Sequence, residues 1–405
     1  MISVNPTPPL RIAFVLAGAT FVVGTATYFV AGVLGEIARD FSISLGAAGQ
    51  LTSAFALSYA VTAPVLTALF SHVERRRLMT LALMVFALAN VVAALAPHFT
   101  GLMLSRVLAA LAAGLITPVA VAAGAQLSPE SHRGRIMALI MGGITVAFAF
   151  GVPLGTLLGA TAGWRPVFLG LAVAALMAAL AIRSLLPQMW STAPPGRAAF
   201  VVLRDPRLLI TLLLTALSFA SAFTVFAYIG PVLAQTAGMS PSTMSFALLL
   251  FGLTALGGTA IGGVLADRVR LGPAITLGLL LIALTQGAFS LLGLLPEGSL
   301  RLGAAIALMA IASLPGFAFV PLQQERLAML AGPHMPVAVA LHASAIFLGQ
   351  ASGAMLGGII VTQAGLAYLG GAALIVGLIG ALVSALANRP AGAFRADRAP
   401  AEAAS

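Results

Sequence analysis

The chain has 405 residues, of which 60% are hydrophobic and only 7% are charged. Soluble domains carry roughly 25% charged residues, so this composition excludes a soluble enzyme, a nucleic-acid reader and a secreted disulfide scaffold. The net charge of +10 arises from 20 arginines and 10 acids. In a membrane protein these arginines indicate on which side each connection lies, rather than a nucleic-acid partner.

Apolar runs long enough to cross a bilayer recur along the chain. A transmembrane helix needs about 20 apolar residues, and clusters of charged or turn-forming residues separate the runs. The first run is followed by further spans, so we interpret it as a retained helix and not as a cleaved signal peptide. Twelve spans are predicted, at 12–34, 48–70, 78–96, 101–124, 136–158, 166–187, 208–234, 243–265, 273–295, 301–323, 337–361 and 368–388.

The long polar connection at mid-chain divides these spans into two sets of six. It contains Pro194, Pro195 and Gly196 followed by arginines. We predict an all-α membrane protein with twelve transmembrane helices in two pseudo-symmetric six-helix bundles. A chain that holds both bundles is expected to act as a monomer. The predicted parts are an N-terminal bundle at 1–187, a cytoplasmic linker at 188–207, a C-terminal bundle at 208–388 and a disordered cytoplasmic tail at 389–405.

The arginines lie mostly in alternate connections. If the N-terminus is inside, sixteen arginines occupy inner positions, and only Arg39, Arg165 and Arg301 are outer. Loops rich in arginine stay on the cytoplasmic side. We therefore predict a multi-pass protein of the bacterial inner membrane with both termini in the cytoplasm.

A glycine pattern repeats at half the chain length. The repeat places the fifth and eleventh spans in corresponding positions, as in a duplicated six-helix unit with a substrate site near the membrane centre. The matching pairs, each 202 residues apart, are Gly151 with Gly353, Gly155 with Gly357, and Gly163 with Gly365.

The connection between the eighth and ninth spans reads Gly263-Val264-Leu265-Ala266-Asp267-Arg268. It resembles the G-x-x-x-D-R signature of the major facilitator superfamily. The corresponding connection of the first half keeps Arg75, Arg76 and Arg77, but Ser71 and His72 replace the Asp-Arg pair. Half of the signature is therefore degraded.

Three further segments are similar to motifs of the same family. Span four contains Ser105 and Arg106, as in the motif whose buried arginine faces the cavity. Span five resembles the Gly/Pro motif of exporters, and span one contains Gly24-Thr25-Ala26. Together they resemble the sugar-efflux and purine-nucleoside-efflux branch of the twelve-span drug:proton antiporters. The resemblance implies export by alternating access, with proton antiport. The span-five residues are Gly151-Val152-Pro153-Leu154-Gly155 and Gly163-Trp164-Arg165.

Two sets of residues are predicted to act in gating. Small residues let helices approach closely in lipid, so Gly151, Pro153 and Gly155 would let span five bend while two helices slide. The second set lies in the connections: Asp267 could close the inner gate by accepting hydrogen bonds from a facing helix end or an arginine. Arg75 and Arg76 fit either this gate or contacts with anionic lipid. The connection residues of this set are Gly263, Asp267, Arg268, Arg75 and Arg76.

A proton-coupled exporter normally has a titratable group inside a span, but no acid is predicted at mid-membrane. In the resembled branch a glutamate follows Gly-Thr-Ala of span one, and here that position is Thr27. His342, whose reference pKa is about 6.5, is the candidate for proton coupling, with a packing role as the alternative. Arg106 would hold a substrate oxygen or anion, or would orient span one through its carbonyls.

The remaining polar side chains of the presumed cavity are hydroxyls and amides, with aromatic rings among them. Such groups suit a neutral or anionic small molecule, such as a sugar, a nucleoside or an amphipathic amide. The predicted substrate-binding residues are Thr27, Tyr28, Tyr59, Arg106, Thr145, Phe148, Thr224, Tyr228, His342 and Gln350.

No cofactor and no metal are expected. The chain has no cysteine, its five histidines have no zinc-ligand spacing, and no ATP-binding glycine loop is present. It has no catalytic constellation, so it is not predicted to be an enzyme. The expected partners are a small-molecule substrate, protons and membrane lipids, without nucleic acid. Two alternatives to a proton antiporter stay open: a proton-independent facilitator or importer, and a transport-inactive membrane sensor or partner subunit.

Overall fold

The computed structural model of the chain describes residues 9–190, 204–332 and 335–388. In this part, twelve helical segments are long and apolar enough to cross a membrane, as the sequence predicted. A bilayer core offers no water to backbone N–H and C=O groups, and helices satisfy these groups internally. The predicted tail at 389–405 and most of the predicted linker, 191–203, lie outside the described residues.

Two of the first six spans begin with a side chain that caps free N–H groups. The Ser44 hydroxyl accepts from the Ala47 N–H at 3.1 Å, and both carboxylate oxygens of Glu74 accept from the start of the next span. The elements of this half are α1 (Pro9–Tyr28), η1 (Phe29–Ala31), α2 (Leu34–Asp40), α3 (Leu45–Leu69), α4 (Arg75–Leu95), α5 (Phe99–Leu127), η2 (Glu130–His132), α6 (Arg133–Val146), η3 (Ala147–Gly151), α7 (Val152–Ala162) and α8 (Trp164–Leu185).

The second half starts in the same way. Asp205 and Ser240 cap helices whose first residues are Pro206 and Pro241, and proline suits this position because it lacks the N–H that would be left unpaired. The elements are α10 (Pro206–Phe226), α11 (Ile229–Ala237), α12 (Pro241–Arg268), α13 (Leu271–Ala288), η4 (Phe289–Leu294), α14 (Ser299–Ala331), α15 (Met335–Gln363), η6 (Leu366–Tyr368) and α16 (Leu369–Ala387).

Two spans differ most from their predicted bounds. The seventh, predicted as continuous over 208–234, is interrupted at Ala227 and Tyr228 between α10 and α11. The tenth, predicted to end at residue 323, continues as α14 to Ala331 in spite of Pro315 and Pro321. Periodicity predicts that a span exists, but its exact bounds depend on caps and packing.

The two bundles repeat the same helix pairs. In the first bundle α1 packs on α6, α3 on α5, and α4 on α8; in the second α10 packs on α15, α12 on α14, and α13 on α16. The repeated glycines contribute to this correspondence. Gly151 faces Thr25 of α1 and Gly353 faces Ala220 of α10, while Gly163 (φ 91°) and Gly365 (φ 101°) end their helices in the left-handed region.

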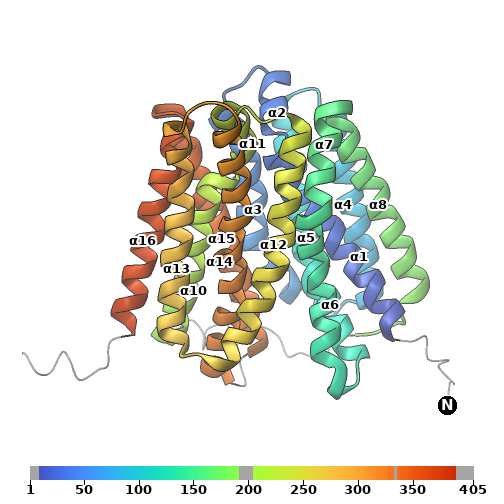
Figure 1. The fold of residues 1–405 in the computed structure, drawn as a ribbon. Coiled ribbons are helices and arrows are strands. Elements are labelled where there is room, and N and C mark those ends of the chain that lie inside the picture. The colour runs from blue at the N-terminus through green and yellow to red at the C-terminus, as the bar shows by residue number, and fades with distance from the viewer. Residues whose placement is uncertain (1–8, 191–203, 333–334, 389–405) are drawn as a thin grey trace, which may run out of the picture.

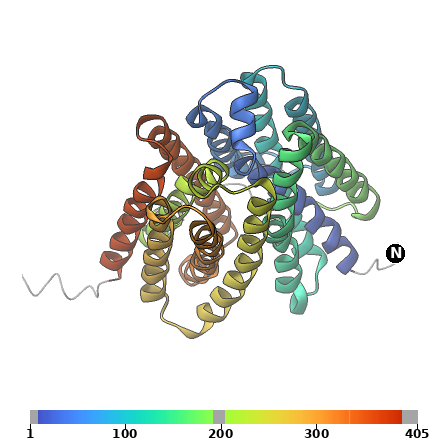
Figure 2. The ribbon, with the colours of Figure 1, turned by 45° about the horizontal axis from the view of Figure 1, so that its top comes forward.

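The first described helix begins and the last one ends at the same face of the molecule, which we call the terminus side (Figure 1). The opposite face, the far side, carries the short helices α2 and α11 (Figures 1 and 2). The bundles meet where α3 packs along α15 and where α12 packs on η3 and α7. Toward the terminus side, α12 and α6 diverge (Figure 1). Among the described residues, α12 therefore contacts the first bundle mainly through η3 and α7.

Candidate functional site

A cavity of about 220 Å³ lies between the two bundles. None of the described residues that line it carries a charge, and aromatic rings dominate its walls. The lining residues include Tyr28, Tyr59 and Phe148 from the first bundle and Phe219, Phe223, Phe226, Phe251, Phe289, Phe317 and Phe347 from the second, with Thr117, Ser218, Gln286, Ser313 and Gln350 as polar members.

Aromatic stacking holds these walls together. The Tyr28 ring stacks on Phe148 with centroids 4.2 Å apart and meets the edge of Phe226 at 6.5 Å. The Tyr59 ring of α3 stacks on Phe347 of α15 at 3.7 Å, so this pair joins the two bundles. Offset and edge-to-face pairs of this kind stabilise the contact beyond the area they bury. The cavity therefore has rigid, flat walls suited to a planar apolar group.

Two side-chain hydrogen bonds cross between the bundles within the described residues. Gln350 Nε2 of α15 donates to the Tyr28 hydroxyl at 3.2 Å, beside the cavity. The Ser245 hydroxyl of α12 donates to the Pro153 carbonyl at 2.9 Å. Both bonds would have to break if the far side opened.

Four of the ten predicted substrate-binding residues line the cavity: Tyr28, Tyr59, Phe148 and Gln350. The Thr27 hydroxyl donates to the Val23 carbonyl at 2.7 Å and the Thr224 hydroxyl to the Ala220 carbonyl at 2.8 Å, so both are engaged by their own helices. Thr145, half-buried on α6, and the other predicted residues also lie outside the lining. Sequence reasoning identified the aromatic character of the site but not which hydroxyls reach it.

Arg106 is 1% exposed within α5. Its Nη1 donates to the Ala26 carbonyl of α1 at 2.9 Å, and its guanidinium lies 4.4 Å from the centre of the Phe55 ring. Its Nε and Nη2 have no hydrogen-bond partner among the described residues. The contact with Ala26 corresponds to one of the two predicted roles, orientation of span one through a carbonyl.

His342 is 3% exposed on α15, and its Nε2 has no hydrogen-bond partner in the described part of the chain. Gly349 and Gly353 of the same helix pack against the Ala216 and Ala220 carbonyls of α10. Since His342 lies two turns before Gly349, it shares this face of α15. The histidine is therefore next to the cavity-lining Ala343 in sequence but on the α10 side of the helix.

The far side is sealed by glycines, which sequence reasoning did not identify as gating residues. A β-carbon at Gly49 of α3 would overlap the Tyr228 hydroxyl, and one at Gly230 would lie 2.7 Å from the Gly32 carbonyl oxygen. Tyr228 is fully buried, and its hydroxyl donates to the Ala354 carbonyl at 3.0 Å. Predicted as a substrate-binding residue, Tyr228 instead belongs to the seal, at the break between α10 and α11.

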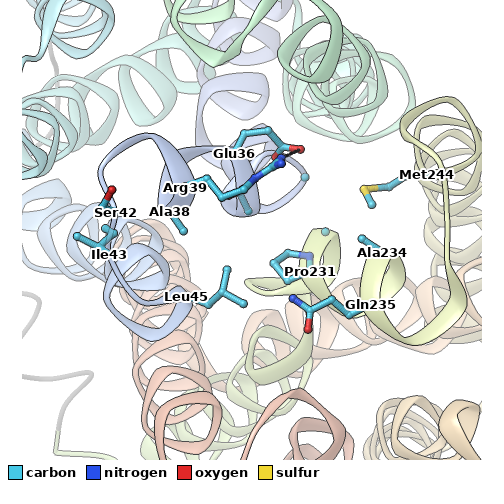
Figure 3. A pocket seen from close by; sticks show the side chains of 13 residues that line it. Glu36, Ala38, Arg39, Ser42, Ile43, Leu45, Pro231, Ala234, Gln235 and Met244 are labelled. Atoms are coloured by element: carbon cyan, nitrogen blue, oxygen red, sulfur yellow. Dashed lines mark hydrogen bonds and ion pairs between the residues drawn. The ribbon is translucent and has the colours of Figure 1, made fainter.

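A second pocket, of about 500 Å³, lies just outside this seal. Glu36 and Arg39 of α2 project along one wall, whereas Pro231, Gln235 and Met244 form the opposite wall (Figure 3). The two walls belong to different bundles, so the pocket exists in this form only while the far side is closed.

The predicted gating residues of span five pack inside the first bundle and against the second. A β-carbon at Gly151 would overlap the Thr25 side chain, and one at Gly155 would lie 3.0 Å from the Phe29 β-carbon. Residues Ala147–Gly151 form a π-helical turn, which is a common cause of a helix bend. The irregular turn of span five therefore ends at Gly151, and Pro153 lies in the first turn of the regular helix α7.

On the terminus side, the predicted latch residues form no ion pair with another described residue. Asp267 and Arg268 are exposed, no ion pair within 4.0 Å involves them in the described chain, and a β-carbon at Gly263 would touch nothing. Arg76 reaches the Leu186 carbonyl at 3.5 Å, while the Arg75 backbone N–H donates to the Met189 carbonyl at 2.8 Å.

Glu74 is the best-bonded acid on this side. It is 7% exposed, and Glu74 Oε1 accepts from the N–H groups of Arg76 and Met189 at 2.9 and 3.3 Å. Oε2 accepts from the Arg77 N–H at 3.1 Å. Glu74 thus caps α4 and holds the residues that follow α8. The described residues contain no group of three His, Cys, Asp or Glu side chains that could hold a metal.

Comparison with known proteins assigns the family. The profile of the Major Facilitator Superfamily matches residues 16–336. The chain belongs to this superfamily. Its members are transporters rather than enzymes, and the twelve helices make this chain a multi-pass membrane protein.

Two relatives illustrate the range of similarity. The inner membrane transport protein YdhP of Escherichia coli (strain K12) is 34% identical over 373 residues, which cover 92% of each chain. The chloramphenicol resistance protein of Streptomyces lividans is 39% identical over 242 residues, 58% of this chain and 62% of that protein.

Solved structures share the fold. A bacterial homologue of the human lysosomal transporter Spinster, crystallised in an inward-facing and occupied conformation, aligns with a TM-score of 0.76 at 20% identity, over 94% of this chain and 96% of its own. The human organic anion transporter MFSD10 aligns with a TM-score of 0.67, also at 20% identity, over 94% of this chain and 100% of its own. At such identities the similarity concerns the fold alone.

Proposed function

We propose that this transporter exports small, neutral, aromatic molecules with hydrogen-bonding groups, such as chloramphenicol. The observation that carries the proposal is the cavity between the bundles: its described lining combines aromatic rings with hydroxyls and amides and contains no charged side chain. A cationic or anionic ligand would find no charge there to offset its loss of water. Among the neutral ligands considered, this lining favours an aromatic drug over a sugar.

Export direction rests on two supports. The chloramphenicol resistance protein of Streptomyces lividans is similar to this chain over 242 residues, and resistance through a membrane transporter requires outward movement. The Gly/Pro segment of span five, around Pro153, resembles that of exporters. We place the terminus side in the cytoplasm of a bacterial inner membrane, because most arginines lie in its connections. The monomeric state and the bundle limits at residues 187 and 208 belong to this proposal.

We assign proton coupling to His342, a buried histidine whose Nε2 has no hydrogen-bond partner among the described residues. A histidine that exchanges a proton during the cycle needs a change of surroundings, and α15 packs against both α10 and the opposite bundle. Arg106 would contribute by fixing α1 beside the cavity through the Ala26 carbonyl.

A proton-independent facilitator is the second candidate. Thr27 occupies the position of the expected coupling acid and is bonded to its own helix, and the described cavity lining contains no titratable acid. A sensor or partner subunit without transport would be the outcome if no ligand moved at all.

The test uses purified protein in liposomes with an imposed pH gradient and labelled chloramphenicol. We expect gradient-driven transport in the wild type, its loss in His342→Gln with downhill exchange retained, and no change in His98→Gln, which alters an exposed histidine at the start of α5. Transport indifferent to the gradient would replace the antiporter with the facilitator. Absence of chloramphenicol movement in both directions would reject the proposed substrate class.

A further inference from the structure

Two polar side-chain atoms of the cavity lining have no hydrogen-bond partner among the described residues, the Thr117 hydroxyl and the Gln350 carbonyl oxygen. Gln350 of α15 is 1% exposed and lines the cavity, and its carbonyl oxygen Oε1 has no hydrogen-bond donor among the described residues. Buried polar groups are nearly always satisfied, and an unsatisfied one requires an explanation. A ligand donor is one such explanation, because the side chain already belongs to the lining.

The other end of the same amide is fixed. Gln350 Nε2 donates to the Tyr28 hydroxyl at 3.2 Å, and stacking on Phe148 holds the Tyr28 ring in place. In this orientation the Tyr28 hydroxyl takes the amide N–H, and the carbonyl is the end of the amide left for another donor. A fixed acceptor loses little freedom when a ligand binds, which favours selective recognition.

The groups around Gln350 differ from it in their hydrogen bonding. Phe347 and Ile346, about one turn earlier on α15, are apolar and also line the cavity. Elsewhere in the spans the hydroxyls of Thr27 and Thr224 are donors, and the carbonyl one turn earlier accepts from each. Gln350 Oε1 is an acceptor, and neither its own helix nor the other described polar groups of the lining give it a donor within hydrogen-bond distance.

We propose that Gln350 selects ligands by accepting a hydrogen bond from a terminal ligand hydroxyl through Oε1, the hydroxyl by which the two probes below differ. This inference rests on the proposed function and names which member of the neutral aromatic class the cavity prefers: one with a donor at the end that reaches Gln350. Without that donor, the ligand would leave the buried carbonyl unpaired and would also lose its own hydration. The Tyr28 hydroxyl acts as a positioning group for the amide.

Thiamphenicol and florfenicol provide a matched pair of probes, since they differ by one hydroxyl that florfenicol replaces with fluorine. We expect the wild type to transport thiamphenicol about fivefold more efficiently, the value of one net hydrogen bond. In Gln350→Met the ratio should fall to about one, through loss of thiamphenicol transport. Gln363→Met, an exposed position on the same helix, should keep the wild-type ratio.

The measurement is the initial rate of each compound in liposomes at several concentrations, with chloramphenicol in parallel. Equal reduction of both compounds in Gln350→Met, or a wild-type ratio near one, would overturn the inference. If Gln350→Met is not monodisperse, Gln350→Asn withdraws the acceptor while retaining an amide and must give the same fall in ratio. Chloramphenicol transport separates the two hypotheses, because its absence in the wild type rejects the proposed function itself.

Discussion

At the far side the two bundles touch through their backbones, whereas at the terminus side their charged connections lie apart. Gly32 and Gly230 meet with no side chain between them, but Asp267 and Arg268 are exposed and form no ion pair in the described chain. Close glycine packing gains from dispersion over a matched surface, and an exposed ion pair gains little. The far-side seal therefore depends on shape.

The largest effect is expected from Gly49→Val, which places a side chain where the Tyr228 hydroxyl lies. The far side could no longer close, and export should fall by more than about tenfold because an overpacked contact is costly. The matched control is Gly18→Val on α1, where an added β-carbon touches nothing.

A single cysteine can report the state of this variant, since the chain has none of its own. Met141→Cys lines the cavity on α6 and should react with a maleimide added from the terminus side. Gly49→Val should reduce this labelling, and Gly18→Val should not. Unchanged labelling and export in Gly49→Val would show that the seal tolerates a side chain.

Asp267→Asn tests the opposite side. The Asp267 carboxylate forms no ion pair with a described residue. The substitution should therefore leave the Tm of the protein unchanged. If Asp267 helps to close the terminus side in the state in which the far side is open, export should fall several-fold. Met141→Cys labelling from the terminus side should then increase. A decrease in labelling would contradict the predicted latch. Glu297→Gln, a highly exposed far-side acid, serves as the control.

Arg165→Ala should weaken the far side within the first bundle. Arg165 pairs with Asp40, donates to the Ala96 carbonyl at 3.4 Å, and stacks over Trp164 at 4.3 Å. We expect a Tm lower by a few degrees, because one half-buried arginine joins three elements. Arg39→Ala, which removes a 79% exposed arginine, should not change the Tm measurably.

Glu74→Ala should give the smallest effect, about 1 kcal/mol of unfolding free energy, as for other lost helix caps. The effect is small because water would replace the lost carboxylate as hydrogen-bond acceptor for the N–H groups of Arg76 and Arg77. Thermal unfolding in detergent measures it. A loss of transport without a change in Tm would indicate that Glu74 acts in gating rather than in capping.

Part of the site could be anticipated from residue types. Tyr28, Tyr59, Phe148 and Gln350 were expected near the cavity because they lie within spans and carry aromatic or amide groups, and all four line it. Tyr228 had the same character in sequence, yet the break between α10 and α11 turns it into the far-side seal. Residue type alone could not distinguish a residue that lines the cavity from one that belongs to the far-side seal.

The seal also explains why its glycines were missed. The chain has 43 glycines, and nothing in their local pattern distinguishes Gly49 or Gly230 from those that face lipid. The signal lies in contacts between residues that are far apart in the chain, such as Gly49 with Tyr228. The span-five glycines were noticed only because a motif and a repeat surrounded them.

By itself, the sequence determined the twelve helices, their division into two sets of six and the correspondence between Gly151 and Gly353, because apolar length and composition set these features locally. Only the tertiary structure decided which faces meet. The close packing of Gly49 on Tyr228 and the bond from Gln350 to Tyr28 depend on how the two bundles pack against each other. That packing is a property of surfaces assembled from distant segments.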